Sequence, residues 1–142
     1  MKSSYLCLVA VMLSATAAGA DQSFDFRLSP GPRLVGTRAQ SSGAGQVHAD
    51  LKGNVLTLSG TYHGLLAAPS AAQLMMGPLP GVRGPKLTDL TITLAANGTI
   101  SGKVTLDRKA MAAFAKGGLY VEITSQPAPD GDLWGWVMPP SE

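Results

Sequence analysis

Apolar and polar residues alternate in short runs along this chain, and glycines and prolines separate the runs. Successive side chains of a β-strand point to opposite faces, so this pattern predicts antiparallel strands that are buried on one face. Many short strands divided by Gly- and Pro-rich turns are typical of a β-sandwich or barrel. We expect strands near residues 23–28, 46–51, 56–63, 71–76, 87–94, 99–106, 119–124 and 133–138.

The clearest alternation covers residues 46–51 and 56–63, and a turn at residues 52–54 joins the two strands. Further along, Asn97-Gly98 stands between two alternating segments, and this dipeptide is the strongest short-range signal for a β-hairpin. The core positions expected from the alternation are Val47, Ala49, Leu51, Leu56, Leu58, Tyr62, Leu90, Ile92, Leu94, Ile100, Val104, Leu106, Leu119, Val121 and Ile123.

One short helix is expected at residues 106–116, before the penultimate strand. Thr105 or Asp107 can cap its N-terminus, its centre is rich in alanine, and Gly117-Gly118 ends it. With the strands, this helix predicts an all-β domain, an antiparallel β-sandwich with one helix.

Proline and glycine mark two interruptions of the strand pattern. Residues 77–85 contain three prolines, which cannot sit within a paired strand, so we expect an ordered loop. Gly135 lies in the middle of the last strand, which indicates a bulge or the close approach of another backbone.

The first 20 residues have the pattern of a secretion signal. Lys2 supplies a positive start, residues 5–13 are apolar, and the segment ends in Ala18-Gly19-Ala20. We expect cleavage near Ala20 and a periplasmic or secreted protein without a membrane span; an uncleaved anchor is the alternative. The remainder then divides into an N-terminal strand with an irregular segment (residues 21–45) and a β-sandwich (residues 46–142).

The composition limits the kinds of ligand and partner that the domain after the leader can have. The single cysteine, Cys7, lies in the leader, so the domain has neither a disulfide nor a thiolate ligand. The net charge is only +2 and the charges are scattered, which argues against nucleic acid as a partner, because phosphate contacts need clustered Lys and Arg.

Several segments resemble the CHRD (chordin-type) domain family. Residues 117–125 read GGLYVEITS, similar to the family pattern G-x-LYVNIHT, and residues 127–135 stand where the family reads P-x-GEIRG. Residues 72–78 read AQLMMGP, where the family often reads AHIH-x-GP. The resemblance covers residues 46–139. It implies a sandwich of immunoglobulin-like or Cu,Zn superoxide dismutase-like shape in secreted or periplasmic proteins, and it implies no enzyme.

The chain departs from the family pattern at three histidines. Gln73, Met75 and Thr124 occupy those positions, so the chain looks like a divergent, bacterial-type secreted member that lacks the family histidines. An amide, a thioether and a hydroxyl cannot replace imidazole as ligands for zinc or Cu(II).

Copper is one candidate ligand of the domain. A soft Cu(I) ion accepts thioether and imidazole ligands, and His63, Met75 and Met138 are the candidate residues. Methionine is also ordinary core filler, and the chain has no Met-x-Met or His-x-His spacing. We therefore expect no metal or other cofactor, with copper as the alternative.

An aromatic surface is the more distinctive candidate. If Leu133, Gly135 and Val137 face the core, Trp134 and Trp136 line the outer face of the last strand. An exposed Trp pair usually marks a binding surface, whereas packing of the pair under the Pro-rich loop or the helix is the alternative. The expected binding surface consists of Met75, Tyr120, Thr124, Trp134 and Trp136.

Catalysis is not expected. His63 and Ser59 share a strand face but stand roughly 13 Å apart at the usual strand rise, too far for a hydrogen bond. The carboxylates of Asp130 and Asp132 are more simply explained as part of a turn before the last strand. The sequence therefore predicts a monomeric, non-catalytic binding or interaction module for an unidentified small molecule or protein. A copper-binding protein and a structural envelope protein with no discrete site are the alternatives.

Overall fold

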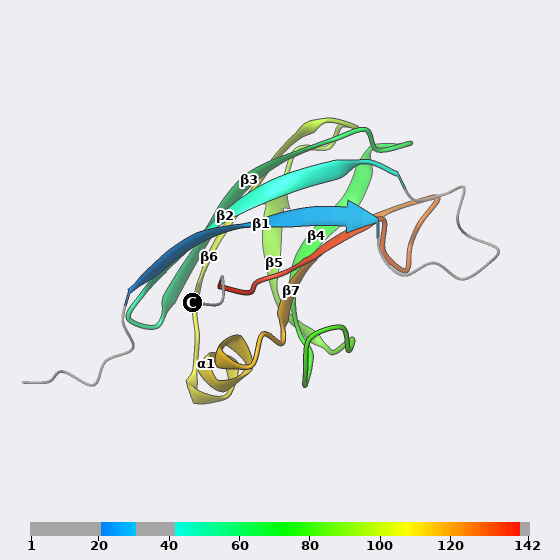
Figure 1. Ribbon diagram of the computed structural model, residues 1–142. Helices are drawn as coiled ribbons and strands as arrows, with labels where there is room; N and C mark the ends of the chain where they lie inside the picture. Colours follow the sequence, from blue (N-terminus) through cyan, green and yellow to red (C-terminus); the bar gives the residue numbers. More distant parts are fainter. Residues whose placement is uncertain (1–20, 31–41, 140–142) are drawn as a thin grey trace, which may run out of the picture.

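Eight antiparallel strands close into a barrel in the computed structural model, which describes residues 21–30 and 42–139 (Figure 1). Around the barrel the strands follow the order β1-β2-β3-β6-β5-β4-β7-β8, and β8 pairs with β1. The strands are β1 (Gln22–Pro30), β2 (Ala44–Lys52), β3 (Val55–His63), β4 (Pro69–Met76), β5 (Lys86–Ile92), β6 (Gly98–Thr105), β7 (Leu119–Ser125) and β8 (Leu133–Trp136). The expected leader, residues 1–20, lies outside the described residues, as do residues 31–41 of the segment 21–45 that was expected to be partly irregular.

The prediction of an all-β fold with one short helix is confirmed, but the expected two-sheet sandwich is corrected to a barrel. Two short seams close it. β8 meets β1 only through Trp134↔Ser29 and Leu133↔Pro30, and β5 meets β6 only at two residue pairs. Alternation along a strand specifies its buried face but not the partner of its edge, so the sequence pattern could not distinguish a sandwich from a barrel.

The interior is filled by the buried face of each strand, as the alternation predicted. Val47, Ala49, Leu56 and Leu58 are all at most 2% exposed. Leu94 is the exception, because it is 71% exposed and its predicted core position is wrong. β5 ends at Ile92, and the chain then leaves the sheet, so the alternation no longer applies to the hairpin loop.

The helix α1 (Arg108–Ala115) lies at one end of the barrel (Figure 1). Asp107 caps it by accepting a hydrogen bond from the backbone N–H of Ala110 at 2.8 Å. Gly117 ends it at φ +72°, and the Gly118 N–H donates to the carbonyl of Ala113 at 2.8 Å. Phe114, on the buried face of the helix, packs with its ring centre 6.2 Å from that of Phe24 in β1.

The glycine in the last strand marks a close backbone approach, as expected. A Cβ atom on Gly135 would lie 2.4 Å from the carbonyl oxygen of Arg27 in β1. The missing side chain therefore lets β8 approach β1 closely where the barrel closes.

Candidate functional site

The outer face of β4, β7 and β8 carries two cross-strand rows of side chains. The register of these strands places the rows side by side; one row is apolar and aromatic, and the other joins two polar side chains to a tryptophan. The rows are Met75–Tyr120–Trp136 and Gln73–Glu122–Trp134. Because directly opposed residues on one face of a sheet lie close enough to interact, each row forms a continuous contact line.

Three aromatic rings form a cluster on this face. The ring centres of Tyr120 and Trp136 are 4.4 Å apart, and those of Tyr120 and Trp134 are 6.0 Å apart. Trp134 meets Trp136 edge to face at 5.3 Å. Tyr120 is fully buried, whereas both tryptophans are partly exposed. Tyr120 thus lies beneath the two tryptophans and packs against both of their rings.

The loop between β4 and β5, residues 77–85, covers this cluster. The Tyr120 hydroxyl accepts a hydrogen bond from the Gly84 N–H at 3.0 Å and lies 3.3 Å from the Gly84 carbonyl oxygen. Arg83 donates to the carboxylate of Glu122 at 2.7 Å. The same guanidinium stands 5.4 Å from the ring centre of Trp134, within the range of a cation–π interaction. The loop is therefore attached to β7 and β8 by side chains.

Glu122 is a buried carboxylate, with its side chain 8% exposed. Burial raises the pKa of Glu122 above its ordinary value, because desolvation disfavours the charged form. The Arg83 guanidinium lowers that pKa, and the nearby charge of Asp130 raises it, but burial is the largest effect. Gly131 leaves room for the pair, since a Cβ there would lie 3.2 Å from the Arg83 guanidinium and 3.3 Å from the Glu122 carboxylate.

The residues of the expected binding surface share one outer face, but they differ in how far solvent reaches them. Trp134 and Trp136 point outward and are accessible, but Tyr120 is 0% exposed and contributes no accessible surface. Its outward direction is as predicted; the loop buries it, and no feature of the strand pattern indicates that cover. Met75 and Thr124 are partly exposed on the same face. Both tryptophans pack against Tyr120 and against each other, and both remain partly accessible.

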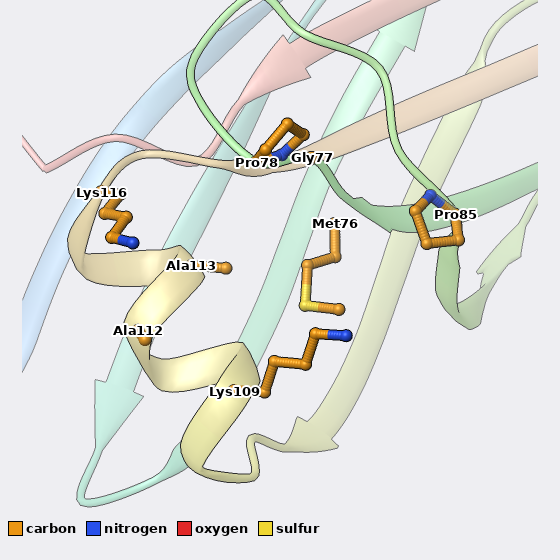
Figure 2. Close-up of a pocket in the computed structure, with 8 residues that line it drawn as sticks. All are labelled: Met76, Gly77, Pro78, Pro85, Lys109, Ala112, Ala113 and Lys116. Atoms are coloured by element: carbon orange, nitrogen blue, oxygen red, sulfur yellow. The ribbon is translucent and has the colours of Figure 1, made fainter.

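A pocket of about 340 Å³ opens on the other side of the same loop (Figure 2). It lies between the loop and α1, with Met76 and Pro85 on one wall and Lys109 and Ala113 on the other. No sequence motif indicated this pocket, because it is formed by two segments that the chain brings together only when the barrel closes.

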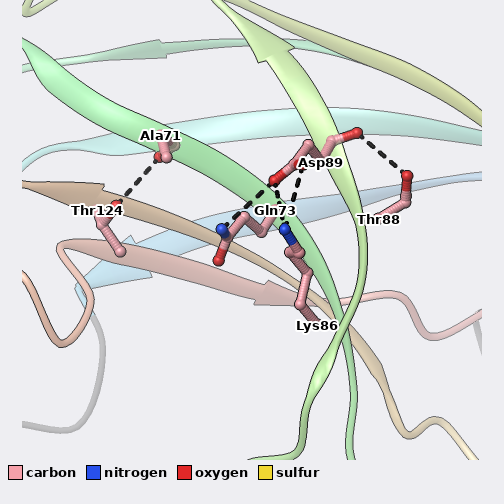
Figure 3. Close-up of polar contacts among 6 residues, drawn as sticks. All are labelled: Ala71, Gln73, Lys86, Thr88, Asp89 and Thr124. Carbon is pink, nitrogen blue, oxygen red and sulfur yellow. Dashed lines mark hydrogen bonds and ion pairs between the residues drawn. The ribbon is translucent and has the colours of Figure 1, made fainter.

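The flank of the face toward β5 is polar (Figure 3). Asp89 accepts a hydrogen bond from Lys86 at 3.2 Å, and the Gln73 amide lies 3.5 Å from the same carboxylate. The Thr124 hydroxyl lies 3.5 Å from the Ala71 carbonyl. Gln73, Met75 and Thr124, where the resemblance implies family histidines, share one outer face of β4 and β7.

Of the three candidate copper ligands, His63 lies on a different part of the barrel from Met75. His63 is on β3, where it lines a separate depression with Arg27 and Thr61. Met75 points outward from β4, and two strands, β6 and β5, separate β4 from β3 around the barrel. Met138 follows β8 and lies next to Gly117 and Pro80. Within residues 21–30 and 42–139, no three His, Cys, Asp or Glu side chains could hold a metal ion together.

A second histidine forms a contact that the sequence analysis missed. His48 Nδ1 lies 2.7 Å from the Asp25 carboxylate, and its Nε2 lies 3.0 Å from the Ser23 hydroxyl. This is the order of groups in a Ser–His–Asp triad. His48 and Asp25 are half exposed on the outer face of β1 and β2. Water at such a position competes for the hydrogen bonds that would stabilise a charged transition state. The order of the three groups therefore does not by itself make a catalytic site. The register Asp25↔His48 brings these residues together, and that pairing could not be read from either strand alone.

The fold and this face define an all-β class of protein, a closed antiparallel barrel with a loop-covered aromatic cluster on its outside. The family model of the CHRD domain matches residues 13–137, and the chain belongs to that family, whose members are typically extracellular. No curated protein and no solved structure matches the chain. Among the described residues, no helix is long and apolar enough to cross a membrane.

Proposed function

We propose that this protein is a secreted, non-catalytic binding module that docks a partner protein through its loop and tryptophans. The contact area, here called the loop–tryptophan surface, consists of Leu79, Val82, Arg83, Trp134, Trp136 and Met138. The observation that carries the proposal is the fixed, partly exposed Trp134–Trp136 pair, held at 5.3 Å beside a guanidinium. Met75 and Thr124 flank this surface on the neighbouring strands.

The chemistry of this surface favours a protein over a small molecule. Trp, Tyr and Arg are the residues that contribute most to protein–protein binding energy, and Arg83 stands directly over Trp134. Leu79, Val82 and Met138 are large apolar side chains that are 56%, 44% and 46% exposed. An exposed apolar group of this kind, bordered by polar residues, is typical of an interaction site.

The surface is also organised before binding. The loop is fixed by Tyr120 and by the Arg83–Glu122 ion pair, so little conformational entropy remains to be lost at Arg83 when a partner docks. The tryptophans are restrained by their mutual edge-to-face contact and by the Tyr120 ring. A small apolar or sugar-like molecule is the alternative occupant of the same surface.

Site-specific photo-crosslinking tests the proposal. A benzophenone side chain at Val82, in the loop–tryptophan surface, should give a crosslink to a defined protein when the protein is expressed and exported in its own host. The matched control is a benzophenone at Thr57, an exposed position on β3. The crosslinked protein is then purified and titrated against the native chain and against Leu79→Ser/Val82→Ser, a variant that leaves Tyr120 and the ion pair in place.

A loss of affinity of about tenfold or more in the serine variant supports the proposal, because apolar contacts at interface centres contribute on this scale. Equal crosslinking at Val82 and Thr57, or unchanged affinity of the variant, contradicts it. Binding of a soluble sugar or small apolar compound that quenches Trp134 and Trp136 fluorescence, without any crosslinked protein, would instead identify a small-molecule module.

A further inference from the structure

We propose that the pocket between α1 and the Pro-rich loop is a second binding site, which takes a small amphiphilic anion with an apolar tail and one anionic head group. The pocket is about 340 Å³, at the lower end of the range for small-molecule sites, about 300–1,000 Å³. It shares no residue with the loop–tryptophan surface, so this inference does not depend on the proposed function.

Apolar groups form the floor of this pocket. Met76, Pro78 and Pro85 line it from the end of β4 and from the loop, and Ala112 and Ala113 line it from α1 (Figure 2). The small alanine side chains leave the space open on the helix side, and the Met76 thioether is adaptable enough to follow the shape of an alkyl or aryl group. An apolar tail would lose contact with water here, which favours binding.

The charged groups of the pocket are both cations. Lys109 and Lys116 stand on the helix wall, and Figure 2 shows the Lys109 side chain extending beside Met76. The lining residues include no carboxylate, and the ion pairs of the described residues involve neither lysine. Two ammonium groups at the rim of an apolar pocket attract an anionic head group while the tail occupies the floor.

Backbone contacts build the pocket in advance. The Gly77 N–H donates to the Gly118 carbonyl at 2.8 Å, and the Met76 N–H donates to the Pro85 carbonyl at 2.9 Å. A Cβ on Gly118 would lie 2.3 Å from the Gly77 carbonyl oxygen, so glycine is required for this close approach. The loop and the end of α1 are thus joined at a defined distance, and the ligand does not have to create the cavity.

The test uses octanoate as the anionic probe and octanol as its neutral counterpart. Isothermal titration and amide chemical shifts of the intact protein should show saturable octanoate binding, with the largest shifts at Met76, Gly77 and residues 109–116. Octanol should bind at least about fivefold more weakly, because it lacks the charge that the lysines recognise. Ala113→Leu, which fills the floor, should reduce binding of both probes.

Charge variants test the head-group contact. Lys109→Gln/Lys116→Gln should weaken octanoate binding by about tenfold and leave octanol binding unchanged, whereas Lys103→Gln, an exposed lysine on β6, should change neither. Equal binding of octanoate and octanol, no saturable shifts at the pocket, or full octanoate affinity in the double variant would each overturn the proposal.

A final arm separates a free anion from a membrane lipid. The native protein and the double lysine variant are sedimented with phosphatidylglycerol vesicles and with neutral phosphatidylcholine vesicles. Octanoate binding without vesicle sedimentation supports a free ligand. Lysine-dependent sedimentation with anionic vesicles, without octanoate binding, would overturn the free-ligand proposal and assign the lysines to a lipid surface.

Discussion

Arg83 donates to the Glu122 carboxylate at 2.7 Å, although the two residues are 39 positions apart in the chain. Arg83 belongs to the Pro-rich loop and remains 44% exposed, whereas Glu122 lies on β7 with its side chain 8% exposed. The pair therefore joins a surface loop to a carboxylate that the fold has removed from water. Exposed pairs add little to stability, but loss of one partner of a buried carboxylate leaves that charge without compensation.

Glu122→Gln should alter the pH dependence of stability. Burial raises the folded-state pKa of Glu122 above its ordinary value of 4.5, so the folded protein retains a proton that the unfolded chain has released. The group therefore favours folding most below pH 4.5, and this contribution is lost as the pH rises through the folded pKa. The Gln variant should lose this decline, as measured by urea unfolding at a series of pH values.

Two variants control the Glu122 measurement. Asp89→Asn, at an exposed carboxylate, should keep the decline of the native protein. Arg83→Gln should extend the decline to higher pH and reduce the unfolding free energy near neutral pH by about 1–3 kcal/mol, because the buried carboxylate loses its partner. Parallel pH profiles for the native protein and Glu122→Gln would show that burial does not perturb this group.

Tyr120→Phe should loosen the Pro-rich loop while the barrel remains folded. The hydroxyl accepts from the Gly84 N–H, and its removal should reduce the unfolding free energy by about 1 kcal/mol. Limited proteolysis should show faster cleavage within residues 77–85. The matched control is Tyr62→Phe, which removes a hydroxyl that bonds the Ala95 carbonyl at 2.8 Å in the β5–β6 loop. Unchanged cleavage in Tyr120→Phe would mean that the hydroxyl does not anchor the loop.

Gly135→Ala should destabilise the seam of the barrel. The new methyl group would approach the Arg27 carbonyl oxygen to 2.4 Å, and relief of this overlap must move β8 away from β1. Overpacking of this kind usually costs about 1–3 kcal/mol, measurable as a lower midpoint of urea unfolding. Ser59→Ala, at an exposed strand position, serves as the control. A native midpoint for Gly135→Ala would show that the two strands can separate at no cost.

Asp107→Ala should weaken α1 and, through it, one wall of the pocket between α1 and the Pro-rich loop. The Asp107 carboxylate satisfies the Ala110 N–H at 2.8 Å, and loss of such a cap costs about 1 kcal/mol. Asp107→Ser can still accept this bond and should retain most of the stability. Hydrogen exchange at Met111, whose N–H donates to the Asp107 carbonyl, reports the fraying of the first turn. Equal exchange rates in the Ala and Ser variants would argue against the capping bond.

The sequence pattern predicted individual elements well where local chemistry decides them. Asp107 was one of two expected caps, and Gly117 ends the helix in the left-handed conformation that favours glycine. The alternation in β2 and β3 identified their buried faces, because a strand has only two faces. The core position predicted for Leu94 was wrong, because the alternation in the sequence continues past the residue at which the chain leaves the sheet.

The candidate site was predictable only in part. The outward direction of Trp134 and Trp136 follows from the parity of β8, but the burial of Tyr120 depends on a loop that folds back over β7. Neither the Arg83–Glu122 pair nor the pocket beside α1 has a local signature, because each joins residues from elements that are distant in the chain.

By itself, the sequence determined the class of fold, the strands, the helix and its ends, and the resemblance to the CHRD family, since these depend on period, turn chemistry and motif order along one chain. Only the tertiary structure decided that the strands close into a barrel through short seams, that the Pro-rich loop buries Tyr120, and that two strands separate the strand of His63 from the strand of Met75. These outcomes depend on which strand edges pair and which loops cover which faces. Such long-range contacts are selected by packing of the whole domain and leave no periodic trace in the sequence.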